Sequence, residues 1–271
     1  MSDQSVTTTH SPEIAAYYLP HEVLILRNND GQLKSIPLIP HGEEVPDKNA
    51  LMQLYTVHRA AICEALMHHT VIVPEGKTEF QWFRALMRLR ATVEGWENTC
   101  EGDEAIGIVP TTDAHVVAIY ERFQPLVQRV VPLVDGDIAG DEYVKKLLKA
   151  NPTPSLILQL ETGSTLENVI AWLLGPDAPS EWGAIAAILT NLTLHTQEAL
   201  VAELTANKTN WRLHEDLLSY IGTNDSAKSR IGVFCDGLCE VAVNGSTSKA
   251  CWSQEKGRSK PSTAVWRWGP V

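Results

Sequence analysis

Between residues 70 and 160 the sequence alternates short apolar segments with amphipathic segments, and this alternation limits the fold more than any other feature. The apolar segments are residues 70–74, 105–110, 130–134 and 155–160. The segments with helical character are residues 78–94, 113–123 and 141–150. Strands that alternate with helices form a parallel sheet covered on both faces. We therefore predict an α/β fold whose functional groups gather at the carboxyl ends of the strands.

Two features precede this alternating block. Residues 22–27 and 33–39 have the composition of strands, and Asn28-Asn29-Asp30-Gly31 between them is a strong turn sequence. A hairpin is therefore predicted there. Asp47 is expected to cap one long amphipathic helix that continues to about His68.

The strand pattern stops after Glu161. The segments that follow have helical periodicity, whereas residues 252–271 are rich in Trp and basic residues and have no clear period. We expect a helical C-terminal region onto which this tail packs. The predicted division is residues 1–46 as a linker segment, 47–162 as the α/β catalytic domain and 163–271 as the helical region.

The composition restricts the partners of the chain. Its 271 residues have a formal net charge of −11, which argues against binding nucleic acid by bulk electrostatic attraction. A site that holds divalent cations is compatible with this charge, because the cations supply positive charge for a phosphate. No apolar run approaches the roughly 20 residues that span a bilayer, so we expect a cytoplasmic protein without a membrane partner.

Two acidic clusters directly follow predicted strands. Glu75 ends the first strand of the block, and Glu79 lies about one helical turn further along. Asp135 and Asp137 follow the third strand and are two residues apart, so they point the same way in an extended chain. Because parallel strands end at the same edge of a sheet, we expect all four carboxylates to lie on one rim.

Four carboxylates on one rim repel each other. Two charges 4 Å apart cost about 4 kcal/mol at an effective dielectric constant of 20. Divalent cations relieve this repulsion, and carboxylates suit Mg²⁺ or Mn²⁺. A single acidic residue after a strand is usually a turn or cap residue, but the combination of both clusters favours a site for two ions, which is suited to cutting phosphodiester bonds.

The two acidic motifs resemble the TOPRIM domain of topoisomerases, DnaG-type primases, RecR and the OLD (overcoming lysogenization defect) nucleases. In that domain one apolar strand ends in Glu-Gly and a later one in Asp-x-Asp, which Glu75-Gly76 and Asp135-Gly136-Asp137 match. The resemblance covers about residues 70–161. It implies a central parallel sheet flanked by helices and a Mg²⁺ or Mn²⁺ site.

Within this group the OLD nucleases are most similar. Glu75 and Glu79 match their Glu-Gly-x-x-Glu form, in which both glutamates bind metal. Thr165-Leu166-Glu167 resembles their third acidic element, which makes Glu167 a further expected metal ligand and Glu161 its alternative. These enzymes also use a lysine from the C-terminal part near the metals, and the resemblance favours Lys249 for this role. The other candidates are Lys228 and Lys260.

The segment Thr7-Thr8-Thr9-His10-Ser11-Pro12 resembles the end of an ABC-type ATPase domain. No Gly-x-x-x-x-Gly-Lys-Ser/Thr phosphate loop is present in the sequence. The chain is therefore expected to be the C-terminal portion of a longer ATPase-nuclease, in which residues 1–46 are the remnant of a covalently linked ATPase domain. DNA is the expected substrate, and a helicase or another component of a nuclease system is a candidate partner.

Three functional hypotheses follow from this resemblance. The first is a Mg²⁺- or Mn²⁺-dependent DNA endonuclease that uses two ions, with Glu75, Asp135 and Lys249 as catalytic residues. The second is a topoisomerase-like or primase-like TOPRIM enzyme, which would need further modules. The third is a non-catalytic TOPRIM module that recruits DNA-repair partners, a role that does not require four intact carboxylates.

Overall fold

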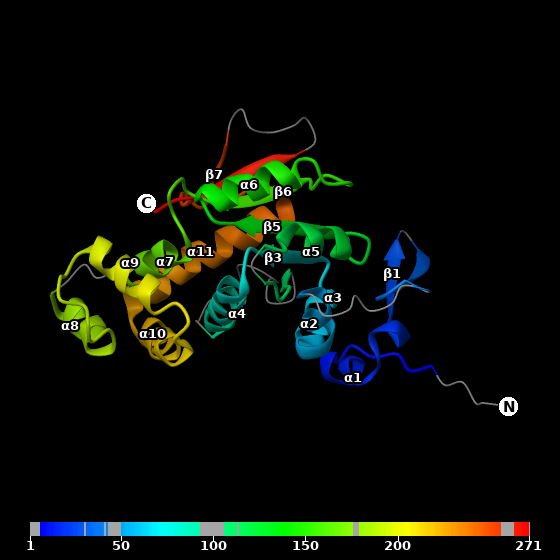
Figure 1. Cartoon of the computed structure of the whole chain (residues 1–271), viewed down its shortest axis with the longest axis horizontal. Coiled ribbons are helices and arrows are strands. Elements are labelled where there is room, and N and C mark those ends of the chain that lie inside the picture. Colours follow the sequence, from blue (N-terminus) through cyan, green and yellow to red (C-terminus); the bar gives the residue numbers. More distant parts are fainter. Residues whose placement is uncertain are drawn as a thin grey trace.

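A six-stranded sheet forms the centre of the structure, a computed structural model (Figure 1). The described residues are 6–29, 31–40, 42, 50–92, 106–112, 114–175, 179–255 and 263–270. The strands are β3 (Thr70–Pro74), β4 (Ile106–Ile108), β5 (Arg129–Val134), β6 (Leu156–Leu160), β7 (Trp252–Gln254) and β8 (Ala264–Trp268). Their order is β4-β3-β5-β6-β8-β7, and all neighbours are parallel except β7 and β8. The predicted α/β class is confirmed, with a mixed and mostly parallel sheet.

Helices cover both faces of this sheet. Val71 and Val73 of β3 belong to one apolar cluster and Ile72 to the other, because successive side chains of a strand point to opposite faces. The first face is covered by α2 (Ala50–Val57), α3 (Arg59–Leu66), α5 (Val116–Phe123) and α6 (Ile138–Leu147). The apolar cluster of the second face includes residues of α4 (Lys77–Ala91), α7 (Leu166–Leu174), α8 (Pro179–Ile188), α9 (Gln197–Ala206), α10 (Trp211–Thr223) and α11 (Asp225–Asn244). Of these, α4 and α11 contact the strands β3 and β4, while α8, α9 and α10 pack against other helices.

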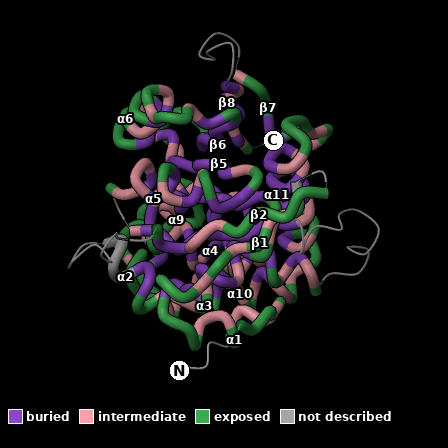
Figure 2. The backbone as a smooth tube through the Cα atoms, turned by 90° about the vertical axis from the view of Figure 1, so that its right-hand side faces the viewer, coloured by how far each residue is buried: buried purple, intermediate pink, exposed green. Residues whose placement is uncertain are grey.

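Burial follows this layering. The strands β5, β6 and β8 are mostly buried in Figure 2, and exposed residues lie on the outer helices and loops. Because both faces are covered, the strands β3, β4 and β6 are almost entirely apolar rather than alternating with polar residues. Among the described residues, no helix has the length and apolar character needed to span a membrane.

The N-terminal residues form a short helix and a separate hairpin, which lie at the opposite end of the molecule from α8 and α10 (Figure 1). These elements are α1 (Pro12–Tyr17), the 3-10 helix η1 (Pro20–Glu22), β1 (Leu24–Asn29) and β2 (Gln32–Pro37). The antiparallel pairing of β1 with β2 confirms the predicted hairpin, although the turn residue Asp30 lies outside the described residues. Arg27 connects the hairpin to the rest of the chain, because its Nε donates to the carbonyl oxygen of Leu126 at 3.0 Å.

The single long helix expected up to His68 is wrong. The structure has two helices, α2 and α3, and His58 between them has φ −107° and ψ 23°, outside the helical region. In a continuous helix the backbone N–H of Arg59 would donate to the carbonyl oxygen of Tyr55. Here the side-chain Nε of Arg59 donates to that oxygen at 3.2 Å. The expected cap residue, Asp47, lies outside the described residues.

The expectation that strands end at Glu161 is also wrong. β8 pairs in parallel with β6, and β7 pairs with β8, so the tail adds two strands to the sheet. Trp252, Trp266 and Trp268 are buried, which confirms that the tail packs rather than presenting its tryptophans to solvent. β8 is defined by its partner β6, about a hundred residues earlier in the chain, more than by its own sequence, and β7 in turn pairs with β8.

Candidate metal centre

The first and third strands of the alternating block deliver two acidic residues to the same rim. β3 and β5 are parallel neighbours, with Pro74 opposite Leu133, so Glu75 and Asp135 follow at the same edge as expected. The backbone N–H of Asp135 donates to Glu75 Oε2 at 3.0 Å. This hydrogen bond joins the two strand ends and holds the Glu75 carboxylate next to the turn that contains Asp135.

The other predicted carboxylates lie close enough to Asp135 to act on its charge. Its pKa is raised to about 9, first because burial disfavours the charged form and then because Glu79, Glu75, Glu167 and Asp137 contribute negative charge. Glu79 lies in the first turn of α4, and Glu167 lies in the first turn of α7. The structure therefore brings the other four predicted carboxylates within electrostatic range of Asp135.

Asp137 also has a structural role in the turn. It is the N-cap of α6, and its Oδ1 accepts a hydrogen bond from the backbone N–H of Gly140 at 2.8 Å. Such a cap satisfies a helix N–H group that would otherwise have no partner. One oxygen of Asp137 thus fixes the start of α6 directly beside Asp135.

The backbone at Gly136 is enclosed by the loop that follows β6. Its N–H donates to the carbonyl oxygen of Ser164, and its own carbonyl accepts from the N–H of Gly163, both at 2.8 Å. A Cβ atom placed on Gly136 would lie 1.7 Å from the carbonyl oxygen of Glu161. The glycine is therefore required by the close approach of two backbones.

We expect Gly136→Ala to lower the free energy of unfolding by about 2–3 kcal/mol, because the added methyl group forces the two loops apart. Urea unfolding followed by circular dichroism measures this change. Gly183→Ala is the matched control, since its Cβ would have no neighbour within 4 Å and alanine favours the helix by up to about 1 kcal/mol. Equal stability of the two variants would contradict the prediction.

Between Glu167 and Glu161, the structure favours Glu167 as the further acidic residue. Glu167 is 9% exposed, and its Oε2 accepts a hydrogen bond from Thr165 Oγ1 at 2.6 Å. Its charge also contributes to the raised pKa of Asp135. Glu161, in contrast, is exposed at the end of β6.

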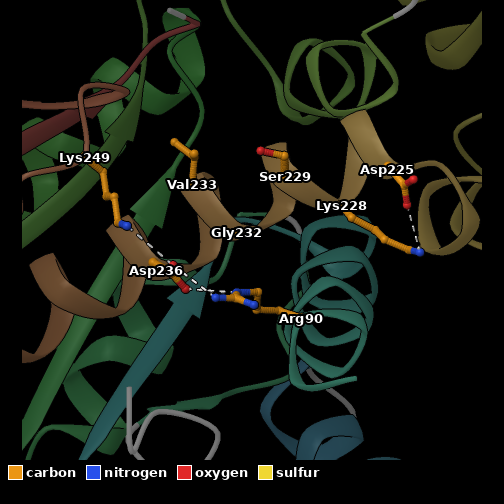
Figure 3. Close-up of a pocket in the computed structure, with 8 residues that line it drawn as sticks. All are labelled: Arg90, Asp225, Lys228, Ser229, Gly232, Val233, Asp236 and Lys249. Carbon is orange, nitrogen blue, oxygen red and sulfur yellow. Dashed lines mark hydrogen bonds and ion pairs between the residues drawn. The ribbon is translucent and has the colours of Figure 1, made fainter. Parts of the chain in front are cut away.

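Lys249 lies in a different environment from these carboxylates. Its Nζ is 3.6 Å from Asp236 Oδ2, and Asp236 Oδ1 accepts from Arg90 Nε at 3.0 Å (Figure 3). Lys228 forms its own ion pair on α11, and Lys260 lies outside the described residues. A catalytic role for Lys249 stays a prediction from the sequence.

The chemistry of the cluster fits a divalent cation, because half-buried carboxylates that act electrostatically on one aspartate favour a bound positive charge. In the part of the chain that the structure describes, no group of three or more His, Cys, Asp or Glu side chains already converges closely enough to hold an ion.

The sequence analysis did not identify Gln159 and Arg267 as residues that support the Asp135 turn. Gln159 is fully buried in β6 and contacts both Asp135 and Arg267. A signal was present, because Gln159 is the only polar residue in the apolar strand Leu156–Leu160. A buried amide needs hydrogen-bond partners. A single amide in an apolar strand next to the acidic rim therefore indicates a contact with that rim.

Comparison with known proteins adds no further information about the site. No family model matches the chain, and neither a curated protein nor a solved structure matches it. An assignment of function must therefore rest on the motif residues and on the arrangement of Glu75, Asp135 and their neighbours.

Proposed function

We propose that this chain is a divalent-metal-dependent DNA endonuclease with a TOPRIM-type domain. The observation that carries the proposal is the meeting of two parallel strand ends, where Glu75 Oε2 accepts a hydrogen bond from the Asp135 N–H at 3.0 Å. Three more carboxylates act electrostatically on the same aspartate. A structural turn needs no such concentration of acidic groups, whereas a cation site does.

Each residue has a proposed task at this site. Glu75, Asp135 and Asp137 would hold metal at the strand ends, while Glu79 and Glu167 would hold it from the first turns of α4 and α7. When bound, two divalent cations supply Lewis-acid stabilisation of the charge on a phosphate and activate water. The hydrogen bonds of Glu75 and Asp137 to backbone N–H groups orient these carboxylates before any ion arrives.

Other parts of the proposal are supported by the sequence alone. These are the DNA substrate, the covalently linked ATPase domain, the cytoplasmic location and the use of Lys249. The motifs Glu75-Gly76 and Asp135-Gly136-Asp137 support the TOPRIM assignment, and the parallel order of β3, β5 and β6 is compatible with it.

Supercoiled plasmid provides the test of the proposed activity. We expect the protein to convert it to nicked and linear forms with Mn²⁺ or Mg²⁺, and we expect EDTA to stop the reaction because the carboxylates alone cannot activate water. Calorimetric titration with Mn²⁺ measures binding separately from cutting. Binding without cutting would favour a non-catalytic TOPRIM module, and failure of both would overturn the metal-centre proposal.

A further inference from the structure

Gln159 is a buried polar side chain in an otherwise apolar strand. It is 0% exposed in the middle of the sheet, where an amide without partners would destabilise the fold. Ile157 and Val265 belong to the cluster on the α6 side of the sheet. Because side chains alternate along a strand, Gln159 and Arg267 point to that same side. The amide therefore lies beneath the start of α6.

The partners of Gln159 account for its whole amide group. Its Nε2 donates to the backbone carbonyl oxygen of Asp135 at 3.3 Å and to Asp141 Oδ1 at 3.0 Å. Its Oε1 accepts from Arg267 Nη2 at 3.2 Å. The amide orientation is fixed by this chemistry, because a carbonyl and a carboxylate only accept, whereas a guanidinium only donates.

Arg267 extends these contacts to the edge of the sheet. It lies directly opposite Gln159 in the parallel pairing of β6 and β8. Its Nε donates to Glu255 Oε2 at 3.0 Å, and its Nη1 donates to Thr162 Oγ1. Its Nη2 also lies 4.0 Å from Asp141 Oδ1. The guanidinium is thus held from several sides, and its side chain is only 18% exposed.

These contacts hold the acidic turn on the side of the sheet that α6 covers. The N–H of Asp135 is bound by Glu75, its carbonyl oxygen is bound by Gln159, and Asp141 in the first turn of α6 is bound by the same amide. Both ends of the segment that carries Asp135 and Asp137 are therefore fixed through one side chain. A leucine at position 159 would fill the apolar strand but could not bind the Asp135 carbonyl oxygen or Asp141, so the amide serves the acidic turn.

We infer that Gln159 and Arg267 are positioning residues for the metal centre, and that strand β8 thereby forms part of its supporting structure. This inference rests on the proposed metal centre. Residues that orient metal ligands commonly change metal affinity by ten- to a hundredfold when replaced. Arg267 positions the Gln159 amide, and the amide positions the backbone from which the Asp135 carboxylate extends.

Calorimetric titration of the full chain with Mn²⁺ tests the inference. We expect Gln159→Leu to weaken Mn²⁺ binding by about tenfold or more, because the Asp135 carbonyl and Asp141 lose their common donor. Arg267→Ala is expected to have a similar effect. Arg267→Lys should recover part of the affinity, since it keeps the charge but lacks the two-pronged geometry of the guanidinium.

Thr263→Val is the matched control. Thr263 is 2% exposed and its Oγ1 donates to the carbonyl oxygen of Pro154 at 2.7 Å, at the opposite end of β8 from the acidic rim. This variant also loses a buried hydrogen bond, but it should bind Mn²⁺ like the wild type. Thermal unfolding verifies that each variant is folded, and Arg267→Lys supplies the comparison if Gln159→Leu does not fold.

The outcomes separate this inference from the proposed function. Absence of Mn²⁺ binding in the wild type would overturn the metal centre and the inference with it. Binding by the wild type together with unchanged affinity in the Gln159 and Arg267 variants would overturn only the inference. Equal loss of affinity in Thr263→Val would also overturn it, because the effect would then be one of general destabilisation.

Discussion

Asp135→Asn is expected to reduce metal-dependent DNA cutting by about a thousandfold or more, which corresponds to about 4 kcal/mol of lost transition-state stabilisation. Asparagine has nearly the same shape, so the hydrogen bonds of the turn should persist. It lacks the negative charge that a divalent cation requires from the central carboxylate of the cluster. Plasmid nicking at a fixed Mn²⁺ concentration measures the loss.

The same substitution should stabilise the metal-free protein. The pKa of Asp135 is about 9 in the folded chain, above the value of 3.8 for an ordinary aspartate, so the folded state binds this proton more tightly than the unfolded state. The wild type therefore loses stability as the pH rises from about 4 to about 9. Asparagine does not titrate, so we expect its advantage in melting temperature to grow over this range.

Asp216→Asn is the control for both measurements, because Asp216 is an exposed residue of α10. It should cut DNA like the wild type and show the same dependence of melting temperature on pH. Undiminished cutting by Asp135→Asn would show that the Asp135 carboxylate is not needed for the reaction, which would contradict the proposed site. A variant that lost activity but showed no gain of stability at high pH would contradict the electrostatic account.

The position of the acidic rim could be predicted because it depends on local patterns. Apolar segments that alternate with helices define parallel strands, and parallel strands end at the same edge of a sheet. Glu75 and Asp135 directly follow such strands, so their proximity required no knowledge of side-chain contacts. The placement of Glu79 likewise followed from its distance of about one helical turn from Glu75, whereas Glu167 was expected only from the resemblance to the OLD nucleases.

The supporting structure could not be predicted because it depends on non-local pairing. β8 is defined by its hydrogen bonds to β6, from which about a hundred residues separate it in sequence. The contact between Gln159 and Arg267 follows from that pairing alone. Lys249 illustrates the same limit, since its ion pair with Asp236 depends on how the chain returns along α11.

Mg²⁺ binding is expected to depend steeply on pH and to release a proton. Asp135 has a pKa of about 9 without metal, so at neutral pH its carboxyl group carries a proton that the ion must displace. A metal ligand must be deprotonated to bind, and one displaced proton changes the apparent affinity by about tenfold per pH unit. Between pH 6.5 and 8.5 the affinity should therefore rise by about a hundredfold, and it should level off above pH 9.

Calorimetry in two buffers with different ionisation enthalpies counts the released protons at pH 7.5. A difference in the observed enthalpy that corresponds to about one proton would support Asp135 as the titrating ligand. Release of no proton, or an affinity that stays constant between pH 6.5 and 8.5, would show that the ion does not bind at this carboxylate. Because the neighbouring acids and burial raise the pKa together, Glu79→Gln should weaken the pH dependence by lowering the pKa of Asp135.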